Sequence, residues 1–142
     1  MKQDIELLNV ISQNSERGKD GVSHLLKISN NTNFNTVLER RLKEYENIYN
    51  TASNLCRKDG NEPASVNPIA KMTSYVTTQI KSMADHSISN MAEMLIQEST
   101  TAVTDITKQV NDYCGSNQKI LGLAKQLLST EQTNIEEMKK FL

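Results

Sequence analysis

The stretch LLSTEQTNIEEM, residues 127–138, places two polar side chains on what reads as the buried face of a helix. Glu131 and Asn134 are three positions apart, so they lie on the same face of that helix. In helical bundles, a Glu and a His at this spacing form half of a di-iron site. Here an Asn stands at the His position. The pair is therefore a metal site, the remains of one, or polar packing.

Four long segments of the chain have apolar residues at the helical period of 3.6 residues. They span residues 4–28, 33–58, 89–113 and 117–142, and none alternates with a period of two for long. A fifth amphipathic segment, residues 68–86, corresponds to a helix of roughly 28 Å at 1.5 Å per residue. The sequence therefore predicts an all-α fold, and the length of 142 residues suits a single domain over residues 1–142.

The links between these segments predict how they are arranged. SNNTN and CGSN are short, so each pair of flanking helices is expected to form an antiparallel hairpin. We expect Thr32 or Asn33 to cap the second segment and Ser116 to cap the last one. The link that contains residues 68–86 is long enough to return along the bundle. The prediction is a four-helix bundle of two antiparallel hairpins joined by a long helical crossover.

This layout resembles the ferritin-like superfamily. It is most similar to a small bacterial branch, described as a domain of unknown function. That branch has a first-helix pattern of the type L-N-x-x-I followed by D-G-x-E-G-Y, and a second helix that ends in G-G-x-P. The matching stretches here are LNVI (8–11), RGKDGV (17–22) and DGNEP (59–63). The resemblance implies a bacterial, ferritin-like bundle.

Metal-binding members of the superfamily resemble one another in their ligands as well. The first and third helices each supply a Glu seven residues before an inward Tyr, and the second and fourth each supply Glu-x-x-His. Carried over to this chain, the two Glu positions fall on Ser15 and Ser99, each with an aliphatic residue at the Tyr position. The fourth helix keeps Glu131 with Asn134. The resemblance thus implies a degenerate di-iron site.

Arg41 occupies the centre of the apolar stripe of the second segment, where an unpaired charge is costly. If the second and fourth helices are antiparallel, Glu131 lies about 4–5 Å from it along the bundle axis. We expect an Arg41–Glu131 ion pair in place of the metal. Its hydrogen-bond partners would be Ser15, Ser99 and Asn134. The alternative is that Arg41 extends to water at the bundle edge.

A shifted set of carboxylates gives an alternative metal site. Glu16, Glu44, Glu98 and Glu131 would hold four carboxylates, although Glu16 is expected to point outward. The chain has only two His residues, and neither falls on an inward position. We therefore expect no cofactor, with iron bound at Glu44, Glu98 and Glu131 as the alternative. In that case the protein would be an iron-binding oxidase or storage protein.

The composition narrows the classes of partner. Sixteen basic and seventeen acidic residues nearly cancel and form no basic cluster, which argues against nucleic-acid binding. No apolar run approaches the roughly 18 residues that a membrane span needs. The N-terminal residues lack a signal-peptide pattern, and Cys56 and Cys114 lack a C-x-x-C context, so we expect free thiols in the cytoplasm. Two Phe and no Trp make a thin core, which favours a homodimer.

The sequence contains no G-x-S-x-G motif, no P-loop and no Cys with a nearby His and acid. The sequence leaves open whether the chain is an enzyme, but the lack of these motifs favours a protein without enzymatic activity. The interpretation that fits best is a structural or protein-interaction module. A second alternative, by analogy with other small helical bundles, is a cytosolic helper in export or coat assembly.

Overall fold

The computed structural model describes residues 2–58 and 86–142, and every regular element within them is an α-helix. The helices are α1 (Lys2–Ile28), α2 (Thr32–Lys58), α4 (Ile88–Asp112) and α5 (Gln118–Lys139). They match the four long helices predicted from the apolar period to within a few residues at each end. The predicted crossover helix, residues 68–86, lies outside the described residues except for its last residue.

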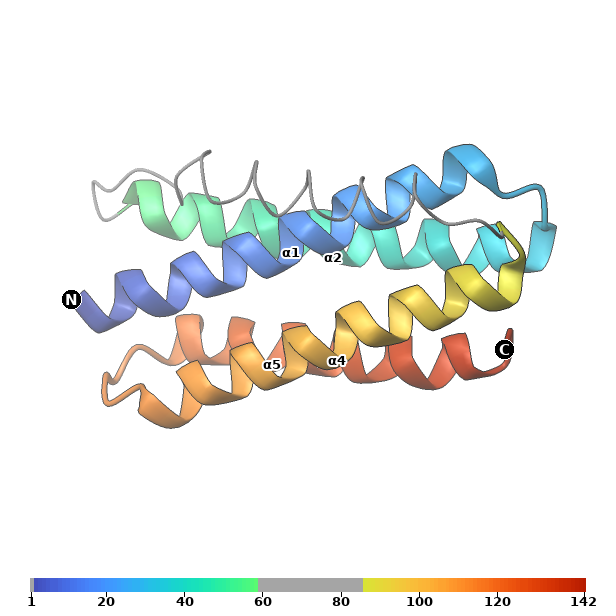
Figure 1. The fold of residues 1–142 in the computed structure, drawn as a ribbon. Coiled ribbons are helices and arrows are strands. Elements are labelled where there is room, and N and C mark those ends of the chain that lie inside the picture. The colour runs from blue at the N-terminus through green and yellow to red at the C-terminus, as the bar shows by residue number, and fades with distance from the viewer. Residues whose placement is uncertain (1, 59–85) are drawn as a thin grey trace.

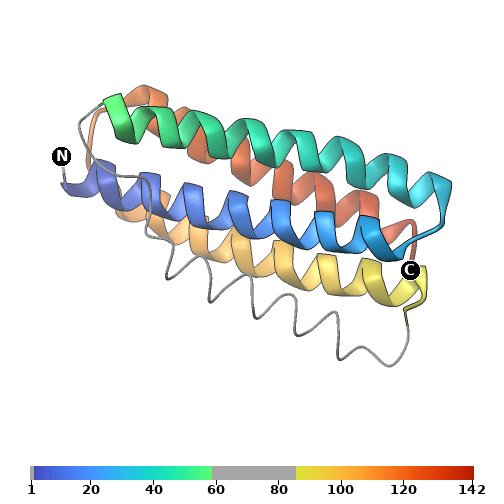
Figure 2. The same ribbon diagram turned by 90° about the horizontal axis from the view of Figure 1, so that it is seen from above.

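The four helices pack as a bundle. α1 and α2 lie side by side and run in opposite directions, as do α4 and α5 (Figure 1). α1 also packs against α4, and α2 packs against α5. Figure 2 shows the same arrangement from above. The end of α2 and the start of α4 lie at opposite ends of the bundle (Figure 1).

The core follows the apolar faces that the helical period predicts. Because these faces turn inward, 21 buried side chains of the described residues, most of them aliphatic, form one hydrophobic cluster. Ile11 of α1, Ile48 of α2, Ile106 of α4 and Leu127 of α5 are each fully buried. Cys56 is buried in the core and Cys114 is exposed, and no disulfide joins them. None of the described helices has a stretch long and apolar enough to cross a membrane.

Two helix starts differ from the predicted ones by one residue. Asn31 caps α2, because its Oδ1 accepts a hydrogen bond of 2.9 Å from the backbone N–H of Phe34. Asn117 caps α5, where its Oδ1 accepts from the N–H groups of Lys119 (3.1 Å) and Ile120 (3.2 Å). The predicted caps, Thr32 or Asn33 and Ser116, are wrong. Asn is as good a cap as Ser or Thr, so the sequence alone does not distinguish between adjacent candidates.

Candidate functional site

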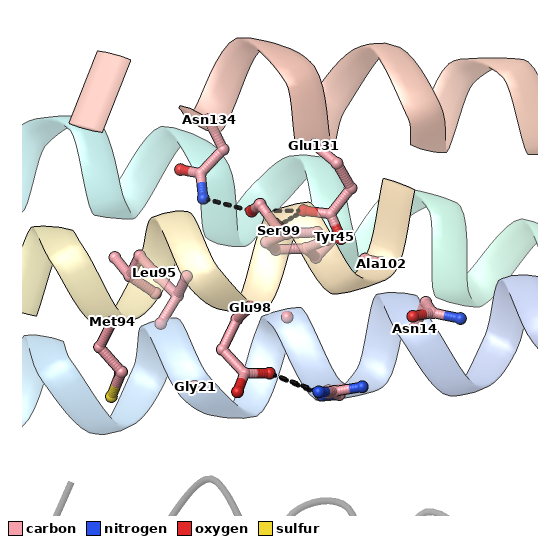
Figure 3. A pocket seen from close by; sticks show the side chains of 13 residues that line it. Asn14, Gly21, Tyr45, Met94, Leu95, Glu98, Ser99, Ala102, Glu131 and Asn134 are labelled. Atoms are coloured by element: carbon pink, nitrogen blue, oxygen red, sulfur yellow. Dashed lines mark hydrogen bonds and ion pairs between the residues drawn. The ribbon is translucent and has the colours of Figure 1, made fainter. Parts of the chain in front are cut away.

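Five buried polar side chains interrupt the apolar core midway along the bundle, and together they form what we call the polar layer. α2 supplies Arg41 and Tyr45, α4 supplies Ser99, and α5 supplies Glu131 and Asn134. None is more than 3% exposed. Figure 3 shows Tyr45, Ser99, Glu131 and Asn134 converging between the helices. The layer therefore joins three helices through side chains that water does not reach.

Hydrogen bonds run through the layer in one direction. Arg41 Nε donates to Asn134 Oδ1 (3.3 Å), and Asn134 Nδ2 donates to Ser99 Oγ (2.8 Å). Ser99 Oγ donates in turn to Glu131 Oε1 (2.9 Å), and Tyr45 OH donates to the same carboxylate oxygen. Asn134 uses both its acceptor and its donor, which fixes the orientation of its amide. Each donor is thus matched to an acceptor, as a buried network requires.

The charge of Arg41 is balanced by two carboxylates other than Glu131. Its Nη1 bonds Glu44 Oε1 at 2.6 Å, and its Nη2 bonds a carboxylate oxygen of Glu137. The predicted Arg41–Glu131 ion pair is therefore wrong, because the two residues connect only through Asn134 and Ser99. The alternative, in which Arg41 extends to water, is wrong too, since its side chain is 1% exposed. Glu137 was missed because it lies beside the apolar stripe of α5.

Ser15 and Glu16 lie outside the polar layer. The Ser15 hydroxyl is buried but donates within its own helix, to the carbonyl oxygens of Ile11 (2.7 Å) and Ser12 (3.2 Å). A helical Ser often bonds the carbonyl four residues back, which lies closer than a side chain on another helix. Glu16 is half-buried beside Tyr49 on α2. The expectation that Ser15 would join the polar layer is therefore wrong.

Burial controls the protonation of Glu131. The pKa of its carboxyl group is raised from the ordinary 4.5 to about 7, chiefly because the group is buried, and the hydrogen bonds from Tyr45 and Ser99 offset part of that rise. The nearby positive charges of Arg17 and Arg41 act in the same lowering direction. Burial, together with the Glu131 charge, raises the pKa of Tyr45 well above its usual value. Tyr45 therefore stays protonated and donates a hydrogen bond, while the Glu131 carboxyl group gains or loses its proton near neutral pH.

A small cavity opens beside the polar layer, between α1 and α4 (Figure 3). Its volume is about 20 Å³, which is room for about one or two atoms of the size of a water molecule. Arg17 and Glu98 line it and form an ion pair, with Nε and Nη2 2.8 and 2.7 Å from one carboxylate oxygen. Gly18 lines it as well, and lets the ring of Tyr45 approach the backbone of α1: a Cβ there would lie 2.5 Å from Tyr45 Cζ. The close packing of Tyr45 against α1 therefore depends on a glycine at this position.

The carboxylates of the alternative metal site are held apart by different partners. Glu44 bonds Arg41, Glu98 bonds Arg17, and Glu131 bonds neutral hydroxyl groups. Within residues 2–58 and 86–142, no three His, Cys, Asp or Glu side chains are placed to hold a metal ion together. The structure therefore does not bring Glu44, Glu98 and Glu131 together as one set of ligands. A carboxylate that pairs with an arginine has its charge satisfied without a metal.

Some site residues were not identified from the sequence. Tyr45 was placed on the buried stripe of α2 but was not recognised as the partner of Glu131. Arg17 and Asn14 flank the stripe of α1, and both line the cavity. A signal was present, because Gly18 on one helix facing a large aromatic residue on the next indicates a close crossing. Periodicity alone assigns such flanking residues to the surface.

No model of a known protein family, no curated protein and no solved structure matches the chain. The resemblance to the ferritin-like superfamily therefore remains a prediction. It depends on the layout of the helices and on the short stretches LNVI, RGKDGV and DGNEP.

Proposed function

We propose that the protein is a ferritin-like bundle in which the polar layer stands in place of a di-iron site, and that it serves as a structural or protein-interaction module. The order and packing of the helices support this proposal. α1 neighbours α2 and α4, and α5 neighbours the same two helices, each neighbour running in the opposite direction. A single long connection between α2 and α4 is typical of ferritin-like bundles.

The observation that carries the proposal is the set of partners around Glu131. A di-iron site of this type needs about six protein ligands, mostly carboxylates with two imidazoles. The polar layer contributes one carboxylate, and one of its oxygens accepts hydrogen bonds from both Tyr45 and Ser99. At the position where Glu-x-x-His would place its imidazole, Asn134 bonds Arg41 and Ser99 instead. In this proposal, hydrogen bonds between side chains connect the helices at the position where a di-iron site would otherwise connect them.

The polar layer also suggests how the bundle keeps one arrangement. Apolar side chains alone let helices slide or rotate at little cost, whereas a network of matched donors and acceptors is satisfied in one register only. Arg41, Ser99 and Asn134 come from three different helices, so a shift of any one would leave buried groups unpaired. A fixed outer surface is what an interaction module needs. The homodimer and the cytoplasmic location expected from the sequence stay predictions.

Elemental analysis tests the proposal. The purified chain, as expressed and after exposure to Fe²⁺ in air, should hold no stoichiometric iron, manganese or zinc. The Glu131→Gln variant is the matched control, since it removes the central carboxylate and keeps its volume. Equal traces in both proteins would mean adventitious metal and agree with the proposal. Two irons per chain in the wild type and none in the variant would overturn it in favour of an iron-binding protein.

A further inference from the structure

The cavity beside the polar layer contains a buried hydrogen-bond acceptor that lacks a partner. Asn14 of α1 is 2% exposed, and its Nδ2 donates to Val10 O (2.9 Å) and Asp105 Oδ2 (3.0 Å). Both of those atoms accept hydrogen bonds only, so the amide cannot be turned around. Its Oδ1 is buried and has no hydrogen-bond partner within the described part of the chain. Figure 3 shows Asn14 at one side of the cavity, with this oxygen toward the other lining residues.

Glu131 lines the same cavity from α5, whereas Asn14 lines it from α1. The charges of Arg17 and Glu98 cancel in their ion pair, so an ionised Glu131 leaves the lining with one net negative charge. The remainder of the wall is largely apolar, with Val22 and Ala102 among its side chains. A buried negative charge is costly unless a positive charge is placed beside it. The wall therefore favours a small cation with hydrogen-bond donors.

We propose that this cavity binds a small ammonium ion, either ammonium itself or methylammonium. Its N–H groups donate to Asn14 Oδ1 and to the Glu131 carboxylate, and a methyl group contacts the apolar wall. A volume of about 20 Å³ admits a ligand of about one or two non-hydrogen atoms. A metal cation fits less well, because two side-chain oxygens fall short of the six or more that such ions prefer. The inference goes beyond the proposed function and does not depend on it.

Nuclear magnetic resonance of the full chain tests this site. Methylammonium chloride is titrated into the protein while the Asn14 side-chain amide and the Glu131 carboxyl carbon are observed. Potassium chloride at equal ionic strength and methanol serve as comparison ligands. Potassium matches the charge but has no donors, and methanol matches the size but has no charge. The expected result is a saturable shift of both signals with methylammonium alone.

Two variants and a matched control complete the experiment. Asn14→Leu and Glu131→Gln should each weaken methylammonium binding by at least about tenfold, the loss expected for one hydrogen bond to a charged group. Asn35→Leu should bind as the wild type does. Asn35 also has a buried Oδ1 without a partner among the described residues, but it does not line this cavity. Glu131→Gln keeps the volume of the side chain, so it decides the question if Asn14→Leu fails to fold.

Each other outcome overturns the proposal. Equal shifts with potassium would mean a general effect of cations, and equal shifts with methanol would mean a cavity that accepts any small solute. The absence of a saturable shift would mean that the cavity holds water alone. Wild-type affinity in Glu131→Gln would remove the carboxylate from the site.

Discussion

Glu131 carries a carboxyl group into the middle of a helical bundle, where its partners are two hydroxyl groups. Tyr45 and Ser99 both donate to Oε1, and no ion pair to Glu131 occurs in the described ranges of the chain. Hydroxyl donors stabilise the ionised form, but burial favours the neutral form more strongly and raises the pKa to about 7. The protonation of this one residue therefore links the stability of the protein to pH.

Glu131→Gln should remove that dependence on pH. Below pH 4.5 the carboxyl group holds its proton in both the folded and the unfolded chain, and its contribution to stability is fully present. As the pH rises from 4.5 through about 7, the unfolded chain loses the proton first and the folded state loses up to about 3 kcal/mol. Urea unfolding at pH 5 to 8 should show that the free energy of unfolding of the variant increases relative to that of the wild type as the pH rises. If the free energies of unfolding of the variant and the wild type changed with pH in parallel, the raised pKa of Glu131 would be contradicted.

Gly18→Ala should destabilise the protein although alanine is the better helix former. A Cβ at Gly18 would lie 2.5 Å from the Tyr45 ring, and moving that ring should cost about 1–3 kcal/mol. Gly122→Ala is the matched control, because nothing lies within 4 Å of a Cβ there. It should stabilise by about 0.5–1 kcal/mol. Thermal unfolding compares the two, and equal stabilisation would mean that Tyr45 does not pack against Gly18.

At the scale of elements, the sequence predicts the helices well because their signals are local. The apolar period and the polar links fix where each helix lies to within a few residues. The caps were misassigned by one or two residues, since adjacent Ser, Thr and Asn side chains are about equally suitable there. The partner of Arg41 was also misassigned. A choice among Glu44, Glu131 and Glu137 depends on side-chain directions on two packed helices, which spacing along a single helix does not contain.

Asn117→Ala should test the cap of α5. Asn117 Oδ1 satisfies two backbone N–H groups at the start of that helix, so its loss should cost about 1 kcal/mol. Ser116→Ala is the control and should change the free energy of unfolding by less than about 0.5 kcal/mol, as expected for an exposed residue without such a role. Chemical denaturation distinguishes them. A larger loss at Ser116 would return the cap to the residue first predicted from the sequence.

At the scale of the whole molecule, the polar layer ties together helices that are distant in the sequence. Arg41 of α2 reaches Asn134 of α5, and Asn134 reaches Ser99 of α4. The sequence predicted these three residues, with Glu131, as members of one buried polar cluster. The sequence did not predict the order of the hydrogen bonds, because that order follows from how three helices pack. Asn134 therefore connects Arg41 of α2 to Ser99 of α4.

The central claim is that this layer of hydrogen bonds, without a metal, holds the bundle together, and unfolding of Asn134→Leu tests it most directly. Leucine keeps the approximate shape but leaves Arg41 Nε without its acceptor and Ser99 Oγ without one of its two partners. The free energy of unfolding should fall by about 2–4 kcal/mol, although leucine is the better helix former. Gln132→Leu, exposed on the same helix, should change it by less than about 0.5 kcal/mol. If Asn134→Leu is as stable as that control, the claim is contradicted.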